Sequence, residues 1–203
     1  MVWPTLDIEN SLWQKGYRYV VGIDEVGRGS WAGPLVAAGV ILPIDFVIPK
    51  GLADSKLVRP QLRKVLADFI AKKAVATYIA EISVSTIDKN GVGEAAQLAF
   101  RQISKRILPK AEFCLIDAFL IKHISKKKQM AVQGGDKVCA SISAASIIAK
   151  VYTDNLMEKL PEKYSQYGFA KHKGYGTKIH QEAIKKYGFS NIHRKSYNLQ
   201  PFL

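Results

Sequence analysis

The sequence predicts an α/β domain built around a mixed sheet. Short apolar runs of strand length alternate with longer stretches of helical patterning, and a glycine-rich turn joins the first two runs as it would join an antiparallel pair. The composition agrees: 203 residues, 48% hydrophobic and 23% charged, are typical of a soluble globular domain with one sizeable core.

The first half of the chain predicts three strands and two helices. Strands are expected over three apolar runs, at residues 17–24, 35–42 and 75–84. Pro60 suits a first helical turn, so a helix is expected over residues 60–72. A longer helix, capped by Ser85 or Thr86, is expected to reach about Leu108.

The second half predicts two more strands and a helix. Residues 111–116 are expected to form a buried strand that ends at Asp117, and a short strand is expected over residues 130–133 after a turn of three lysines. Small residues mixed with isoleucines from residue 137 to about 160 predict a helix packed closely on the sheet.

Charge divides the chain into two expected regions, a catalytic domain at residues 1–158 and a basic C-terminal region at residues 159–203. The whole chain has a formal net charge of +13, and residues 159–203 contribute nine Lys and Arg against two Glu. Such an excess favours a polyanionic partner, most often nucleic acid.

The remaining compositional signals are few. Cys114 and Cys139 are too few for a disulfide framework, and neither belongs to a pair with metal-ligand spacing. Both are therefore expected to be reduced, buried thiols. With no bilayer-length apolar run and no secretory signal in the first ten residues, a cytoplasmic location is expected. The four histidines, which lack metal-ligand spacing, are expected to be structural or exposed: His123, His172, His180 and His193.

Asp24 and Glu25 stand side by side where the first strand should end. Neighbouring strand residues face opposite sides of a sheet, so both acids can serve one site only if the strand breaks at Glu25. Gly27 and Gly29 could then take positive φ values and turn the chain. The alternative is a solvated strand end followed by turn glycines.

Asp117 and Asp136 favour the site over that alternative. Asp117 ends a strand that should lie beside the first, and Asp136 follows Gly134-Gly135 where a helix opens, so its alternative role is an N-cap. Clustered carboxylates raise one another's pKa unless a cation neutralises them, and Mg²⁺ or Mn²⁺ prefers such ligands. A basic protein with a two-metal acidic site points to a nuclease.

Five strings occur in register along the chain: GIDEVGRGSWAGPLVAAGVIL, LADSK, LIDAF, GGDKVCASISAASIIAKVYTD and HKGYGTKIHQEAI…IHRKSY. Each is weak alone, but together they resemble ribonuclease HII, the type 2 ribonuclease H family. The resemblance implies a ribonuclease H-like fold, a five-stranded mixed sheet flanked by helices with a helical C-terminal extension. It also implies a two-metal Mg²⁺ or Mn²⁺ site on four catalytic acids, Asp24, Glu25, Asp117 and Asp136.

The implied reaction is hydrolysis of the RNA strand of RNA–DNA hybrids and incision 5′ of ribonucleotides embedded in duplex DNA, leaving 3′-hydroxyl and 5′-phosphate ends. By the same resemblance, the backbone of Gly27-Arg28-Gly29 senses the ribose 2′-hydroxyl and Tyr175 packs on the following sugar. Taken alone, these residues read as a plain turn and a loop aromatic.

Ser55 and Lys56 are candidate phosphate contacts, with a loop cap and a solvated lysine as the alternative. The chain departs from the family pattern at Ser30-Trp31, where Pro-Leu is expected, and at Leu57, where a second lysine is common. Trp31 is therefore expected to alter the packing under the Gly27-Arg28-Gly29 turn. The C-terminal NLQPFL is not a sliding-clamp box, and a monomer is expected.

Two other interpretations of the sequence stay open. Ribonuclease HIII proteins resemble this chain in the core, but they usually carry a longer N-terminal domain and have no arginine at the position of Arg28. A non-catalytic hybrid-binding protein of the same fold would gain nothing from four acids facing phosphate.

Overall fold

The computed structural model describes residues 3–107, 110–160 and 162–202. The strands among these residues form one five-stranded sheet. The strand order is β3-β2-β1-β4-β5, with β1 antiparallel to β2 and parallel to β4, β2 antiparallel to β3, and β4 parallel to β5. The expected mixed sheet is confirmed. Its strands are β1 (Val20–Val26), β2 (Leu35–Ile41), β3 (Ala76–Ile82), β4 (Phe113–Asp117) and β5 (Gln129–Val132).

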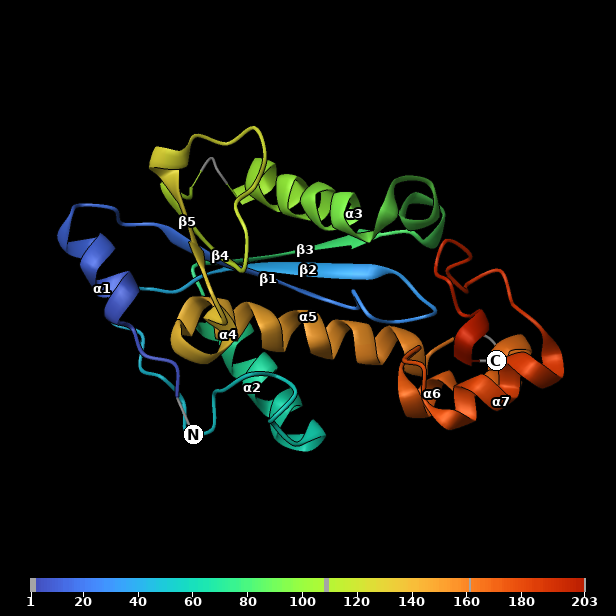
Figure 1. The fold of residues 1–203 in the computed structure, drawn as a ribbon. Coiled ribbons are helices and arrows are strands. Elements are labelled where there is room, and N and C mark those ends of the chain that lie inside the picture. Colours follow the sequence, from blue (N-terminus) through green and yellow to red (C-terminus); the bar gives the residue numbers. More distant parts are fainter. Residues whose placement is uncertain (1–2, 108–109, 161, 203) are drawn as a thin grey trace.

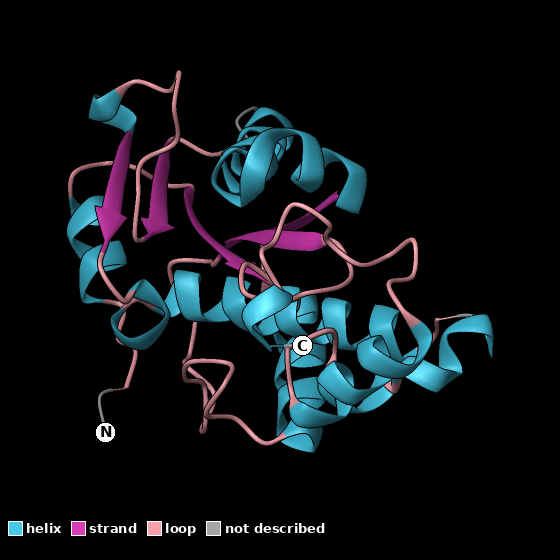
Figure 2. Ribbon diagram, turned by 45° about the vertical axis from the view of Figure 1, so that its right-hand side comes forward, coloured by secondary structure: helices cyan, strands magenta, loops and turns pink. Residues whose placement is uncertain are grey.

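Helices cover both faces of this sheet (Figure 1). α3 lies over one face, α5 and α2 lie over the other, and α6 and α7 extend beyond the C-terminal end of α5; Figure 2 shows the same layers from a second direction. The helices are α1 (Asp7–Gln14), α2 (Pro60–Lys73), α3 (Val84–Ile107), α4 (Gly135–Val138), α5 (Ala140–Glu158), α6 (Phe169–His172) and α7 (Lys178–Tyr187), with 3₁₀ turns η1 (Lys126–Lys128), η2 (Glu162–Tyr167) and η3 (Gln200–Phe202).

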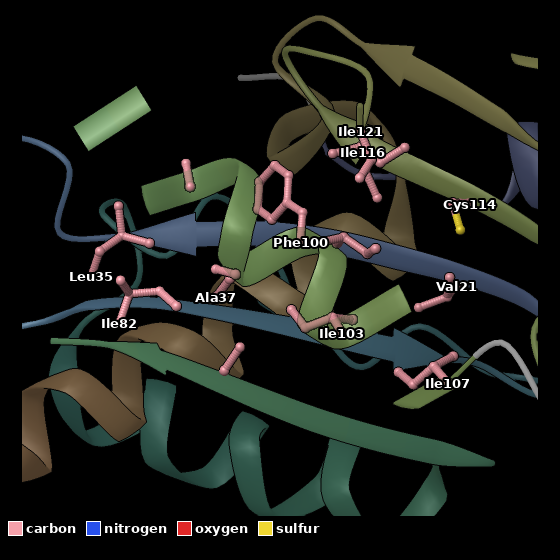
Figure 3. Close-up of a cluster of buried hydrophobic side chains, with 14 of the residues drawn as sticks. Val21, Leu35, Ala37, Ile82, Phe100, Ile103, Ile107, Cys114, Ile116 and Ile121 are labelled. Atoms are coloured by element: carbon pink, nitrogen blue, oxygen red, sulfur yellow. The ribbon is translucent and has the colours of Figure 1, made fainter. Parts of the chain in front are cut away.

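Two apolar layers hold the sheet between these helices. Phe100 and Ile103 of α3 pack on Val21 and Ile116 in one layer (Figure 3). In the other layer the small residues of α5, such as Ala144, let the helix lie close against β1 and β2. Close packing on both faces fixes where the strand ends lie.

β1 does not break at Glu25, which was the condition under which the sequence argument brought both acids to one site. It continues to Val26 in regular register with β2, where Asp24 is paired with Ala38 and Glu25 with Ala37. The ladder to β2 keeps both acids in extended backbone, so their side chains point to opposite faces of the sheet.

The long helix before β4 begins differently from the prediction. Ser83, rather than Ser85 or Thr86, is the capping side chain, because its hydroxyl accepts the Thr86 N–H at 3.3 Å. Gly91 interrupts α3 with a φ of 78°, which divides it into two helical segments. The expected end at Leu108 lies outside the described residues.

The expected helix over residues 137–160 is two helices. Cys139 takes an extended conformation between α4 and α5 and forms a bridge with Thr5. The Glu9 carboxylate of α1, a helix the sequence did not predict, accepts the Ser141 N–H at 2.7 Å at the start of α5. This break places Asp136 in α4, with Gly134 as the N-cap, so the N-cap reading of Asp136 is wrong.

Other expectations hold. α2 lies at the predicted place, and both cysteines are buried and free. Across the three described ranges, we find no helix that combines the length and the apolar character needed to cross a membrane.

Candidate active site

The site begins at the edge of the sheet where β4 ends and its pairing with β1 stops. Ile23 of β1 pairs with Ile116 of β4, so Asp24 and Asp117, the next residues, lie at the same edge of the sheet. Asp117 is further fixed because its Oδ1 accepts the Gly135 N–H at 2.7 Å. This hydrogen bond brings α4, and with it Asp136, to the carboxyl ends of β1 and β4.

All ten site residues predicted from the sequence line one cavity of about 270 Å³ at this edge. Asp24 and Glu25 both line it, although β1 stays regular through Glu25. The cavity therefore gathers residues from five separate stretches of chain: Asp24, Glu25, Gly27, Arg28, Gly29, Ser55, Lys56, Asp117, Asp136 and Tyr175.

Burial and mutual repulsion raise the pKa of three of the acids. The pKa of Asp24 lies well above its usual value, chiefly because the side chain is buried, and the nearby charges of Glu25 and Asp117 add to the rise. The pKa of Asp136 is raised by burial and then by Asp54 and Asp117. The site thus holds more negative charge than its own surroundings neutralise.

Glu25 has one local cation but keeps one oxygen unpaired. Burial raises its pKa, and Arg28, whose Nη1 lies 3.4 Å from Oε1, partly offsets the rise. Its Oε2 is buried and has no hydrogen-bond partner. An orphaned carboxylate oxygen among three other acids suits a hard divalent cation.

The acids are nevertheless not preassembled as a cage. Among residues 3–107, 110–160 and 162–202, no three His, Cys, Asp or Glu side chains are grouped closely enough to hold a metal ion as they stand. The chemistry of the donors, carboxylate oxygens, fits Mg²⁺ or Mn²⁺.

The turn after β1 is only partly as predicted. Gly27 has a φ of 97°, as expected, but Gly29 is outside the left-handed region, so the prediction for Gly29 is wrong. A Cβ atom at Gly29 would meet nothing within 4 Å, because that position faces open space. Arg28 extends over the Phe119 ring, 5.3 Å from its centroid. The glycine at position 29 therefore leaves room for close approach to the backbone.

Trp31 packs against the loop that carries Tyr175. A Cβ atom at Gly176 would lie 2.2 Å from the Trp31 ring, and the Trp31 N–H donates to the Gly174 carbonyl at 2.8 Å. Trp31 at this position thus supports the loop that carries Tyr175, and its expected effect on the packing under the Gly27-Arg28-Gly29 turn stays a prediction.

Comparisons with known proteins agree with this geometry. The family model described as Ribonuclease HII matches residues 21–200. Ribonuclease HII of Roseiflexus castenholzii is 44% identical over 96% of this chain and 88% of its own length. Ribonuclease HII of Chloroherpeton thalassium is 46% identical over 94% and 95%.

The chain belongs to the ribonuclease HII family. Among solved structures, that of the PCNA:RNase HII complex from Archaeoglobus fulgidus matches with a TM-score of 0.75 and 27% identity, over 89% of this chain and 96% of that one. The fold is ribonuclease H-like, and the chain is a metal-dependent endonuclease of the type 2 ribonuclease H class. The two alternative interpretations, a ribonuclease HIII and a non-catalytic hybrid-binding protein, are set aside.

The sequence missed two polar side chains of this ribonuclease HII site, Ser146 and Lys150 of α5, which also line the cavity. Their spacing of four residues puts them on one helix face, a signal that could have found them. Lys150 Nζ lies 2.6 Å from Asp154 and 5.5 Å from the centroid of the Tyr175 ring. Lys150 therefore connects Tyr175 to α5.

Asp154 continues this connection to the Ser55 loop. Its Oδ2 accepts from Arg63 Nη1 at 2.7 Å, and Arg63 Nε donates to the Ser55 carbonyl at 3.0 Å. Ser55 itself is buried, and its hydroxyl accepts from Ser146, whereas Lys56 is exposed. None of the four histidines lines the cavity within the described part of the chain; His123 is exposed, and the three buried ones are His172, His180 and His193.

Proposed function

We propose that the protein hydrolyses the RNA strand of RNA–DNA hybrids and incises duplex DNA on the 5′ side of a single embedded ribonucleotide, leaving 3′-hydroxyl and 5′-phosphate ends. The observation that carries this proposal is that one cavity holds the four acids together with the Gly27-Arg28-Gly29 turn. A phosphodiester at the acids would thus have its ribose beside an exposed stretch of backbone.

The acids would hold two Mg²⁺ or Mn²⁺ ions: Asp24, Glu25, Asp117 and Asp136. Bound there, the ions would lower the pKa of the attacking water and stabilise the leaving 3′ oxygen. The protein contributes rigid placement, because the β1 and β4 ladders fix Asp24 and the Gly135 N–H fixes Asp117. Arg28 holds Glu25 in place without neutralising the whole site.

Substrate positioning would come from the rest of the cavity. The turn at Gly29 is open enough for its backbone to reach the 2′-hydroxyl, the group that separates RNA from DNA. Tyr175 would pack on the following sugar. Lys56 and the Ser55 hydroxyl would contact phosphate. Because the Ser55 hydroxyl accepts a hydrogen bond from Ser146, its own proton is available to donate.

The basic C-terminal region would supply affinity for the duplex backbone. Residues 159–203 carry nine Lys and Arg against two Glu. Contacts of this kind do not depend on sequence and weaken as salt displaces them. We propose residues 1–158 as the catalytic domain and residues 159–203 as this duplex-binding part.

The test is cleavage of two substrates in Mg²⁺ or Mn²⁺: a DNA duplex with one ribonucleotide and an RNA–DNA hybrid. We expect cutting of both, with incision at the single site mapped to its 5′ side. Asp24→Asn and Asp117→Asn should each abolish cleavage and leave the circular dichroism spectrum unchanged. Asp68→Asn, a change at an exposed acid of α2, should leave cleavage unchanged.

Two results would contradict the proposal. Cutting of the long hybrid alone would remove incision at embedded ribonucleotides. Full activity of Asp24→Asn or Asp117→Asn would remove the four-acid site.

A further inference from the structure

The guanidinium of Arg194 is buried and is held by backbone carbonyls of the chain that follows β1. Arg194 is 0% exposed. Its Nε donates to the Gly33 carbonyl at 3.0 Å, Nη2 donates to Pro34 at 2.9 Å, and Nη1 donates to Gly27. Burial lowers the pKa of Arg194, because removing a cation from water disfavours its charged form. The carbonyl dipoles aimed at this cation compensate for that burial.

Tyr197 completes the arrangement. Its hydroxyl accepts from Arg194 Nη1 at 2.9 Å and donates to the Arg28 carbonyl. Asp88 of α3 fixes the same segment, since its Oδ1 accepts the backbone N–H and the hydroxyl of Ser196 at 2.9 and 2.8 Å. The carbonyls of Gly27 and Arg28 are therefore both held from the C-terminal segment.

Holding these two carbonyls also orients two N–H groups. In a planar trans peptide the C=O and the next N–H point in opposite directions. The Gly27 carbonyl thus directs the Arg28 N–H away from Arg194, and the Arg28 carbonyl does the same for the Gly29 N–H. Gly27, Arg28 and Gly29 all line the cavity, and the space beside Gly29 is open.

We propose that Arg194 is a positioning residue for ribose recognition. By holding the carbonyls of Gly27 and Arg28, it presents the N–H groups of Arg28 and Gly29 as donors to the 2′-hydroxyl oxygen of the ribonucleotide. This role rests on the proposed function. Lysine cannot replace Arg194, because an ammonium group lacks the planar fork that reaches several carbonyls at once.

The experiment compares binding of two DNA duplexes that differ by one 2′-hydroxyl, in EDTA so that neither is cut. The readout is the ratio of the two Kd values. We expect Arg194→Lys to lower the preference for the ribonucleotide duplex roughly tenfold, equivalent to about 1.4 kcal/mol, with affinity for the all-DNA duplex retained. Tyr197→Phe, which keeps the guanidinium, should lower the preference about threefold.

The matched control is Arg101→Lys, which changes an arginine of α3 that pairs with Glu94 outside the cavity. It should keep the wild-type ratio. A folded Arg194→Lys protein with the wild-type ratio would overturn the role of Arg194, as would equal weakening on both duplexes, which is the signature of a merely structural residue. If Arg194→Lys does not fold, a wild-type ratio in Tyr197→Phe decides against the proposal.

The experiments distinguish failure of the proposed function from failure of the role proposed for Arg194. A wild-type protein that neither prefers nor cuts the ribonucleotide duplex would refute the proposed function and this inference together. A wild-type protein that does both, alongside unchanged ratios in Arg194→Lys and Tyr197→Phe, would refute this inference alone.

Discussion

Acidification should destabilise the C-terminal region through two buried histidines, His180 and His193. Both are almost completely buried, and their Nε2 atoms lie 3.0 Å apart. His193 Nδ1 accepts the Ser190 N–H at 2.8 Å, and His180 Nδ1 lies 3.0 Å from the Tyr175 carbonyl, to which it donates. The chain of hydrogen bonds is complete only when both rings are neutral, with His193 Nε2 donating to His180 Nε2.

The magnitude follows from the two pKa values. Burial lowers the pKa of each ring from 6.5 to about 4, with His172 adding to the shift. An unfolded chain takes up protons near pH 6.5 and the folded chain only near pH 4, so stability is lost as the pH falls through this window. At about pH 5 the loss is about 2 kcal/mol for each histidine, or about 4 kcal/mol for the pair.

The assay is urea unfolding near pH 7.5 and pH 5 of the wild type and of a His180→Gln/His193→Gln variant. Glutamine keeps a donor and an acceptor but does not titrate. We expect a steeper loss of unfolding free energy on acidification in the wild type. Asp24, Glu25 and Asp136, whose raised pKa values act in the opposite direction, are common to both proteins. Equal pH slopes, or NMR titration of either ring near pH 6.5, would refute the reasoning.

Three further predictions concern single residues. Gly22→Ala should cost about 3 kcal/mol or more in urea unfolding, because its Cβ atom would lie 2.2 Å from the Ser141 carbonyl carbon. Glu9→Ala should cost about 1–3 kcal/mol in the same measurement, because the buried Ser141 N–H loses its acceptor. Asp24→Asn should raise the melting temperature of the metal-free protein at neutral pH, an advantage that disappears toward pH 3.8 because the raised pKa penalises only the carboxylate. Mn²⁺ should then raise the melting temperature of the wild type but not of this variant.

Some of the site could be predicted because the evidence is local. Asp24 and Asp117 each end an apolar run, and parallel strands bring their carboxyl ends to one edge. Gly27 was predicted correctly because a tight turn directly after a strand needs a positive φ. Such signals depend on neighbouring residues, which sequence patterns record well.

Other predictions were wrong where contacts with segments distant in sequence decide the local structure. The sequence predicted a strand that ends at Asp24, but pairing with β2 keeps the strand regular to Val26. It also predicted one helix from residue 137, whereas the bridge between Thr5 and Cys139 divides that stretch in two. In both cases a partner remote in sequence outweighs the local preference.

By itself the sequence determined the mixed sheet, the acids at its edge and the basic C-terminal region, because periodicity, strand ends and charge are properties of short stretches. Only the tertiary structure decided which backbone groups of the Gly27-Arg28-Gly29 turn are held and which are left for a ligand. Arg194 lies more than 160 residues away in sequence, and no local pattern reveals that its guanidinium is buried against that turn. Buried hydrogen bonds of this kind form only when packing removes water from both partners.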